Sequence, residues 1–131
     1  MTLSVALTSD VAPEMAPIAA DPRALHAMLV NLVENSLDAC RVDKKPAHAV
    51  VLRAREDAGH AVIEVEDDGI GMDVETREKA FSAFFSSKGA EGTGLGLFIA
   101  HKIVAAHKGT ITIDSRLHEG TRFTVRIPRV A

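Results

Sequence analysis

The chain has no tryptophan or tyrosine, and Cys40 is its only cysteine among 131 residues. A single cysteine cannot form an internal disulfide, and it excludes a zinc site built from a cysteine cluster. This low cysteine content fits a protein from a reducing compartment. Because the large aromatic residues are missing, Phe, Ile, Leu and Val side chains have to build the hydrophobic core.

Long apolar runs are also missing, so no segment is long enough to cross a bilayer. The first residues show no basic segment followed by an apolar stretch, and we expect no signal peptide. We therefore expect a cytoplasmic chain without direct membrane contact, whose parent protein could carry an anchor elsewhere. The net charge of −3 argues against a nucleic-acid partner. The length suits one domain with a sizeable core.

Periodicity and turn residues predict the order strand, helix, two strands, short helix, helix, two strands. Asp21-Pro22 is typical of a helix start, because Asp caps and Pro tolerates the first helical position. Gly109 is expected to cap the last helix. The strands are expected over residues 3–8, 50–55, 60–67, 110–115 and 121–127, and the helices over 21–40, 73–80 and 94–108. This order predicts an α/β (α+β) two-layer sandwich, a mixed sheet covered on one face by helices.

Both long helices are expected to be amphipathic, each with one apolar face toward the sheet. In the helix over 21–40, the inward residues would be Leu25, Met28, Leu29, Leu32, Val33 and Cys40. In the helix over 94–108, they would be Leu95, Phe98, Ile99, Ile103 and Ala106.

Asp67 stands at the inward-facing end of an apolar strand, because Glu64 and Glu66 occupy the opposite face. A buried carboxylate needs a partner. Asp67 could accept a hydrogen bond from an exocyclic amino group such as that of adenine. Guanine would present a carbonyl oxygen there, a mismatch that costs about 1–3 kcal/mol. The alternative is that Asp67 only caps the Asp-x-Gly turn that follows it.

Thr121 is a second polar residue at the end of an apolar strand face, which it shares with Phe123, Val125 and Ile127. Such a polar exception could have a functional role. It could equally be an ordinary strand threonine after the Glu119-Gly120 turn.

Asn31, Asn35 and Asp38 lie on one line of the helix over 21–40, because their spacing is i, i+4, i+7. Asn is a mediocre helix former, so two on one stripe are unusual. Neutral amide oxygens suit a Mg²⁺ ion that also binds phosphates, since the phosphates supply the charge. The alternative is a polar helix flank without a ligand.

Residues 88–97 are rich in glycine and lead into a helix that we expect to start at Gly94. Glycines let the backbone approach phosphates, and a helix start offers free N–H groups. The segment is no Rossmann fingerprint, because no strand precedes it, and it lacks the Gly-Lys-Ser/Thr ending of a Walker loop. The alternative is a flexible loop.

These sites, in this order, resemble the GHKL superfamily, and in particular the ATP-binding catalytic (HATPase_c) domain of bacterial two-component sensor histidine kinases. Residues 31–39, 67–72, 81–88 and 92–97 are similar to the N, G1, F and G2 boxes, and residues 120–123 to the terminal strand motif. The resemblance implies a Bergerat-type ATP-binding fold. It also implies that residues 1–131 are a single catalytic domain, with the dimerisation and phosphoacceptor domain absent.

The resemblance assigns roles to individual residues. Asp67 would accept the adenine amino group, with Gly71 and Thr121 helping through water. Asn35 would bind Mg²⁺, and Asn31 would lie near the phosphates. Lys88 would belong to an ATP lid, which Phe84 and Phe85 would anchor. The residues implied to bind nucleotide are Asn31, Asn35, Asp38, Asp67, Gly69, Gly71, Met72, Lys88, Gly92, Thr93, Gly94, Leu95, Gly96, Leu97 and Thr121, and those implied in catalysis are Asn31, Asn35 and Lys88.

Three departures from the family pattern bear on function. Hydrolytic members carry a Glu one turn before the magnesium-binding Asn, and here Asn31 takes that place. Glu34 has the wrong helical phase to replace it as a base for water. Many kinases have a Lys three residues after that Asn, where this chain has Asp38. None of the six histidines fits a phosphoacceptor: His26 and His101 lie inside helices, and His48, His60, His107 and His118 lie at element ends or in loops.

We therefore expect a protein histidine kinase domain that binds Mg-ATP and donates the γ-phosphoryl group to a histidine on a separate dimerisation domain. A response regulator would be an indirect partner. Alone, the chain should bind ATP or ADP without phosphorylating itself, because transfer depends on positioning a second group.

Two other functions remain open. One is a free-standing anti-sigma-type serine kinase or partner-switching protein of the same superfamily, although residues 84–88 favour the histidine-kinase branch. The other is a protein-binding module that no longer uses ATP, against which Asp67 and Asn35 argue.

Overall fold

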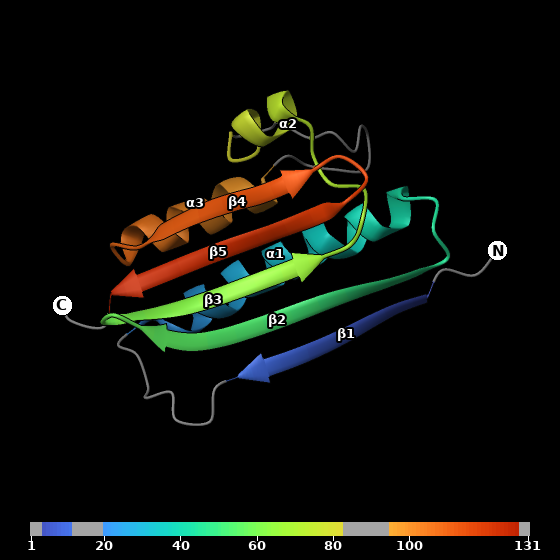
Figure 1. Cartoon of the computed structure of the whole chain (residues 1–131). Coiled ribbons are helices and arrows are strands. Elements are labelled where there is room, and N and C mark those ends of the chain that lie inside the picture. Colours follow the sequence, from blue (N-terminus) through green and yellow to red (C-terminus); the bar gives the residue numbers. More distant parts are fainter. Residues whose placement is uncertain (1–3, 12–19, 83–94, 129–131) are drawn as a thin grey trace.

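The computed structural model describes residues 4–11, 20–82 and 95–128. Within these segments, five strands form one mixed sheet in the order β1-β2-β3-β5-β4 (Figure 1). β1 runs parallel to β2, and the other neighbours are antiparallel. The elements are β1 (Ser4–Val11), α1 (Pro22–Val42), β2 (Ala47–Asp57), β3 (His60–Asp67), α2 (Val74–Lys79), α3 (Gly96–Ala106), β4 (Thr110–Arg116) and β5 (Gly120–Pro128).

Helices α1 and α3 pack side by side on one face of the sheet, and α2 lies beyond β4 (Figure 1). The core lies between these two layers. Its buried residues are Met28, Leu32, Cys40, Val50, Ile63, Val65, Ala100, Val104, Phe123, Val125 and Ile127. The predicted two-layer sandwich with helices on one face is confirmed.

Helix α1 begins as predicted. The Asp21 carboxylate accepts hydrogen bonds from the N–H groups of Arg23 (3.0 Å) and Ala24 (3.4 Å), and Pro22 takes the first helical position. Every residue expected on its inward face is buried or packs against the core. The helix continues to Val42, two residues beyond the predicted end.

Helix α3 differs from its prediction in start and in phase. It begins at Gly96 with Leu95 as N-cap, whereas we expected a start at Gly94, which lies outside the described residues. Ile99 is 40% exposed and Ala106 is exposed, while Leu97, Ala100 and Val104 contribute to the core. The predicted inward face was wrong in part, because apolar residues on nearly all sides leave the helical phase undetermined by sequence.

The end of α3 also corrects a prediction. Lys108, with φ +59°, takes the left-handed position that we expected of Gly109. The Gly109 N–H instead donates to the Val104 carbonyl at 3.0 Å, which completes a Schellman-type ending. A Cβ on Gly109 would overlap the carbonyl oxygen of Arg126, so this glycine is needed for close packing on β5.

Two strands are longer than predicted. β1 extends to Val11, and β2 runs from Ala47 to Asp57, because β2 pairs with β1 from Ala47 and with β3 as far as Asp57. The turn expected at residues 57–59 is present, with positive φ at Ala58 (49°) and Gly59 (80°), as in a type I′ hairpin.

The sheet face opposite the helices carries charge pairs. Arg53 pairs with Glu66 at 2.7 Å and Arg55 with Glu64 at 3.4 Å, which confirms that both glutamates face away from the core. Such exposed pairs contribute little stability.

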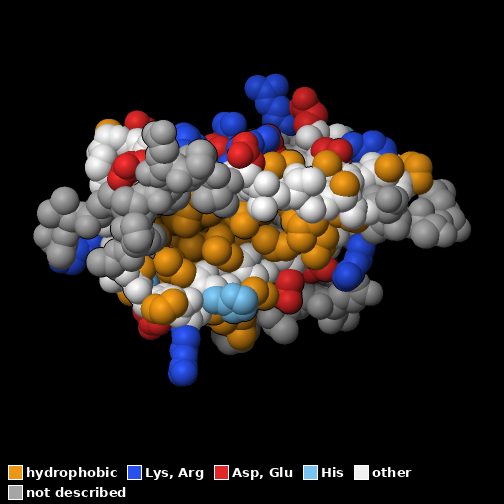
Figure 2. Space-filling view, turned by 90° about the horizontal axis from the view of Figure 1, so that it is seen from below, with side chains coloured by type: hydrophobic (Ala, Val, Ile, Leu, Met, Phe, Trp, Pro, Cys, Tyr) orange, Lys and Arg blue, Asp and Glu red, His pale blue; other side chains and the backbone are white. Residues whose placement is uncertain are grey.

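Seen from below, the molecule shows a band of apolar side chains (Figure 2). Among the described residues, no helix is both long and apolar enough to cross a membrane.

Candidate functional site

Asp67 is the last residue of β3 and is 4% exposed, so it faces inward as predicted. Its Oδ1 accepts a hydrogen bond from the Gly69 N–H at 2.9 Å, which is the turn-capping role. Its Oδ2 is buried and has no hydrogen-bond partner within the described segments. One oxygen therefore holds the turn, and the other makes no hydrogen bond of good geometry to a described residue.

The surroundings of Asp67 favour the binding of a hydrogen-bond donor to its carboxylate. Burial raises the pKa of Asp67, and the hydrogen bond from Gly69 and the nearby Ser36 hydroxyl oppose this effect in part. The neighbouring Asp68 carboxylate adds to the increase. The Ser36 hydroxyl is fully buried and, like Oδ2, makes no hydrogen bond of good geometry to a described residue. An amino group placed here would satisfy a buried acceptor that is costly to leave unpaired.

Thr121 lies directly opposite Asp67 in the β3–β5 pair and is 3% exposed. Its hydroxyl is 2.8 Å from the Ser115 hydroxyl. Ser115 in turn donates to the Gly120 carbonyl and accepts from the Met72 N–H, both at 2.9 Å. One hydroxyl thus ties β4, β5 and the segment after β3 together beside Asp67.

Glycines bring the backbone together around this strand end. Gly71 (φ +70°) and Gly120 (φ +113°) have positive φ, and a Cβ on either would overlap a carbonyl oxygen, that of Arg116 or of Asp67 respectively. A Cβ on Gly69 would lie 2.6 Å from the Ala39 carbonyl carbon of α1. The Ile70 N–H donates to that same carbonyl at 3.0 Å. The turn after Asp67 is therefore held directly against α1 and the β4–β5 hairpin.

Two amides of the α1 stripe lie beside this region. Asn31 and Asn35 are both half-buried, and neither amide is hydrogen-bonded to another described residue. A Cβ on Gly96 would lie 3.7 Å from Asn31 Oδ1, so the start of α3 adjoins Asn31. Neutral amide oxygens in this setting fit the donor set that Mg²⁺ uses together with phosphates.

Asp38, the third residue of the stripe, forms a salt bridge to Arg41 at 3.1 Å. This contact gives Asp38 a structural role on α1. Its predicted contact with nucleotide stays a prediction.

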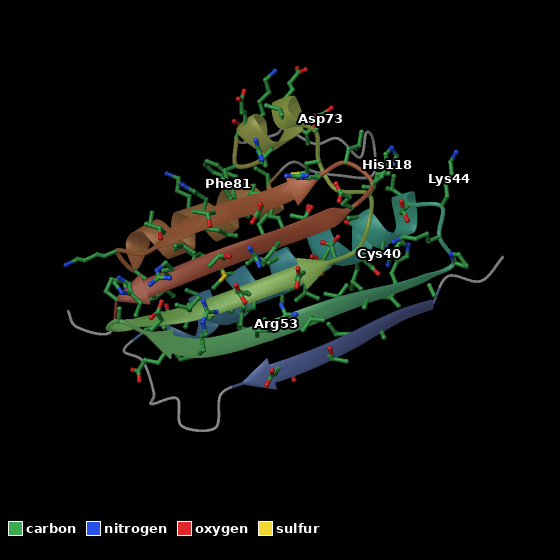
Figure 3. All side chains as sticks on the ribbon, in the orientation of Figure 1. Cys40, Lys44, Arg53, Asp73, Phe81 and His118 are labelled. Carbon is green, nitrogen blue, oxygen red and sulfur yellow. The ribbon has the colours of Figure 1, made fainter. Side chains whose placement is uncertain are left out.

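Part of the predicted site lies outside the described residues, namely Phe84, Phe85, Lys88, Gly92, Thr93 and Gly94. Of the neighbouring predicted residues, Leu95 caps α3, and Leu97 and Met72 pack against the core. Phe81, labelled in Figure 3, lies with its ring centroid 5.1 Å from that of His101 on α3.

Sequence reasoning missed Ser36, Ser115 and the burial of His48. Ser36 shares the i, i+4 stripe of Met28 and Leu32, and Ser115 ends the inward face of β4; the rule that identified Thr121 would have found both. His48, expected at an element end or in a loop, is only 5% exposed within β2.

Similar curated proteins are sensor kinases. The chain is 39% identical over 121 residues to the sensor histidine kinase ZraS of Escherichia coli O157:H7, covering 92% of this chain and 24% of that protein. It is 29% identical over 125 residues to sporulation kinase E of Bacillus subtilis, covering 95% and 16%. The chain thus spans a quarter or less of these relatives. They give no support to the serine-kinase alternative.

Solved structures of the same fold are catalytic domains of histidine kinases or contain one. The catalytic domain of histidine kinase ThkA matches with a TM-score of 0.81 and 28% identity, over 95% of this chain and 79% of that one. Full-length ShkA, solved in complex with AMPPNP, matches with a TM-score of 0.82 and 27% identity, over 95% and 25%.

The family model described as histidine kinase-, DNA gyrase B- and HSP90-like ATPase matches residues 20–131. Its match includes α1, the turn after Asp67 and the β4–β5 hairpin, the elements that build the site. The chain belongs to this family, as an ATP-binding catalytic domain of the sensor histidine kinase type.

Proposed function

We propose that this chain binds Mg-ATP with the adenine amino group on Asp67 Oδ2 and presents the γ-phosphoryl group to a histidine on a separate dimerisation domain. The observation that carries the proposal is the buried Oδ2, which lacks a partner within the described segments while Oδ1 is occupied by Gly69. A nucleobase with an amino group supplies the missing donor, and one with a carbonyl oxygen does not.

The reaction needs little covalent chemistry from this domain. The lone pair of the acceptor imidazole forms a bond to the γ-phosphorus, the bond to the β–γ bridging oxygen breaks, and ADP leaves with that electron pair. Binding and positioning are what this domain contributes. An amide at Asn31 cannot accept a proton from water, which favours transfer over hydrolysis.

Asn35 is the residue that would hold Mg²⁺, Asn31 would lie near the phosphates, and Lys88 would belong to the ATP lid. The ion would neutralise phosphate charge. This division of roles fits the half-buried amides on α1 and the closeness of Asn31 to Gly96. The remaining partners in the proposal are the dimerisation domain of the parent kinase and, indirectly, a response regulator, in the cytoplasm where ATP is found.

The test is calorimetric titration of ATP and of GTP, each with Mg²⁺, into wild type, Asp67→Asn and Asp57→Asn. Asp57 is an exposed carboxylate at the far end of β2 and serves as the matched control. We expect wild type and Asp57→Asn to bind ATP and not GTP. Asp67→Asn should bind ATP at least about tenfold more weakly, because its amide N–H₂ would face the adenine amino group, and both groups are hydrogen-bond donors.

Binding of GTP as tight as ATP, or unchanged ATP binding in Asp67→Asn, would remove the adenine assignment. Transfer is tested separately by supplying a histidine-bearing dimerisation domain and following ³²P from γ-labelled ATP. Label on that domain and none on the chain alone is the expected result. Label on a serine of a partner protein would instead support the serine kinase.

A further inference from the structure

A second cluster of reactive side chains lies behind the end of β3, next to the turn that follows Asp67. Cys40 ends a buried stripe of α1, His48 lies near the start of β2, and Asp68 follows β3. Their possible ligand atoms, one for each residue, all lie within 4.8 Å of one another. Cys40 lies where α1 passes behind the sheet (Figure 3). None of the three has a role in the nucleotide site.

His48 is enclosed in this cluster with its side chain 0% exposed. Its Nδ1 lies 3.0 Å from Asp68 Oδ1 and 3.2 Å from the Asp68 carbonyl oxygen. Its Nε2 faces Asp43 Oδ2 at 3.4 Å but makes no hydrogen bond of good geometry with any described residue. Nε2 therefore faces the Asp43 carboxylate, and Nδ1 is the ring nitrogen on the side of Asp68.

The charge in the cluster is also incomplete. Two carboxylates, those of Asp43 and Asp68, face the two ring nitrogens of one imidazole. The nearest lysine, Lys45, directs its Nζ to the Asp68 carbonyl oxygen at 3.0 Å rather than to a carboxylate, and it is exposed. A cation between the thiol, the ring and the carboxylate would offset this negative charge.

We propose that Cys40, His48 and Asp68 bind a divalent cation of the zinc class. Thiolate, imidazole and carboxylate together are the donor set of Zn²⁺ and Co²⁺, whereas Mg²⁺ prefers oxygen donors alone. Two ligands of a tetrahedral metal with bonds of about 2.0–2.1 Å stand about 3.3–3.4 Å apart. His48 Nδ1 and Asp68 Oδ1, now 3.0 Å apart, would have to separate by only about 0.3 Å to hold such an ion. Three protein ligands leave a fourth position to water.

Proton positions follow from this arrangement. Coordination through Nδ1 leaves the ring proton on Nε2, which faces the Asp43 carboxylate, so Asp43 becomes the outer partner that orients the ring. Burial, together with Asp67, Asp68 and Asp43, raises the pKa of Cys40 to about 11, and Lys45 opposes the increase. The thiol therefore gives up its proton to solvent when the metal binds, and binding should tighten as pH rises.

The site is separate from the proposed magnesium position, because Asn35 is not among its ligands. Metal binding here is measured without nucleotide, so its outcome does not depend on the proposed kinase function.

The experiment titrates Co²⁺ into the untagged chain in metal-free buffer without nucleotide. We expect one equivalent to produce a thiolate-to-cobalt charge-transfer band and tetrahedral d–d bands. One equivalent of Zn²⁺ should abolish these bands, and excess Mg²⁺ should not. A wild-type spectrum without a thiolate band would overturn the proposal. This test uses only the wild-type chain, so it does not depend on whether a variant folds.

Variants assign the ligands. Cys40→Ser should remove the charge-transfer band, and Cys40→Ser and His48→Gln should each weaken Zn²⁺ binding at least about tenfold. His118→Gln, which changes an exposed histidine, is the matched control and should bind like wild type. Circular dichroism verifies that each variant is folded. Equal Zn²⁺ affinity in wild type and in folded His48→Gln would show adventitious surface binding and would overturn the proposal.

Discussion

The two ends of the β3–β5 strand pair differ in how closely the neighbouring chain packs against them. At the Asp67–Thr121 end, polar side chains are buried, and a Cβ on Gly120 would overlap the Asp67 carbonyl oxygen. At the opposite end, where His60 lies beside Pro128, the adjoining hairpin is exposed, and a Cβ on Gly59 would meet nothing within 4 Å.

The difference lies in what each end is required to do. The buried end holds Asp67 Oδ2 in place without a described partner, which only close packing from several sides can maintain. The open end only reverses the chain, and its contacts are exposed ion pairs such as Arg126–Asp57 at 3.3 Å. Equivalent changes at the two ends should therefore have unequal effects, and the predictions below test this.

The largest difference is expected between Gly120→Ala and Gly59→Ala. At Gly120, φ is +113° and the new Cβ would overlap backbone, so we expect a loss of about 3–5 kcal/mol in the free energy of unfolding. At Gly59, φ is +80° but space is open, so only the backbone cost of about 1–2 kcal/mol remains.

Urea unfolding of the two variants and wild type measures both costs. Equal losses at the two glycines would show that the crowding at the Asp67 end does not constrain the backbone. The slopes of the transitions should match that of wild type, since neither change alters the surface exposed on unfolding.

The next effect concerns the charge of Asp67. Asn keeps the oxygen that accepts from Gly69 and removes a carboxylate whose ionisation is opposed by burial. Asp67→Asn should thus make the nucleotide-free fold more stable at neutral pH, by on the order of 1 kcal/mol, while weakening ATP binding. A residue that lowers stability but supports binding is typical of a functional position.

The sign of the pH dependence follows from the direction of the pKa shift. The folded-state pKa of Asp67 is raised above its ordinary 3.8, so the folded chain holds this proton more tightly than the unfolded chain. The stability that Asp67 contributes is present below pH 3.8 and is lost as pH rises through the raised pKa. The advantage of Asp67→Asn over wild type should therefore grow from pH 4 upward and then level off. A constant difference across pH would contradict the raised pKa.

Strand alternation was enough to place Asp67 and Thr121 from sequence, because each strand has one apolar face and a polar exception stands out. The phase of α1 was equally readable, since polar residues mark its outer side. These predictions needed only local pattern.

The rest depended on contacts between distant segments. The phase of α3 is set by packing on α1 and β4, because its own sequence is apolar nearly all round. Lys108 takes a left-handed conformation because Gly109 is needed against Arg126, a contact that no local pattern reveals. His48 is buried by the end of α1 and by Asp68 after β3, and Asp68 is 20 residues away in sequence.

The smallest predicted effect lies at the open end, where Ala58 holds φ +49° in the β2–β3 turn. Asn tolerates this conformation better than Ala, and Asn-Gly is the preferred pair for a type I′ turn. Ala58→Asn should raise the free energy of unfolding by about 0.5–1 kcal/mol. ATP affinity should stay at the wild-type value, because the turn lies at the opposite end of β3 from Asp67. Paired urea unfolding and ATP titration check both expectations. A change in ATP affinity would mean that the two ends of the strand pair are energetically coupled, and the contrast between them would then not hold.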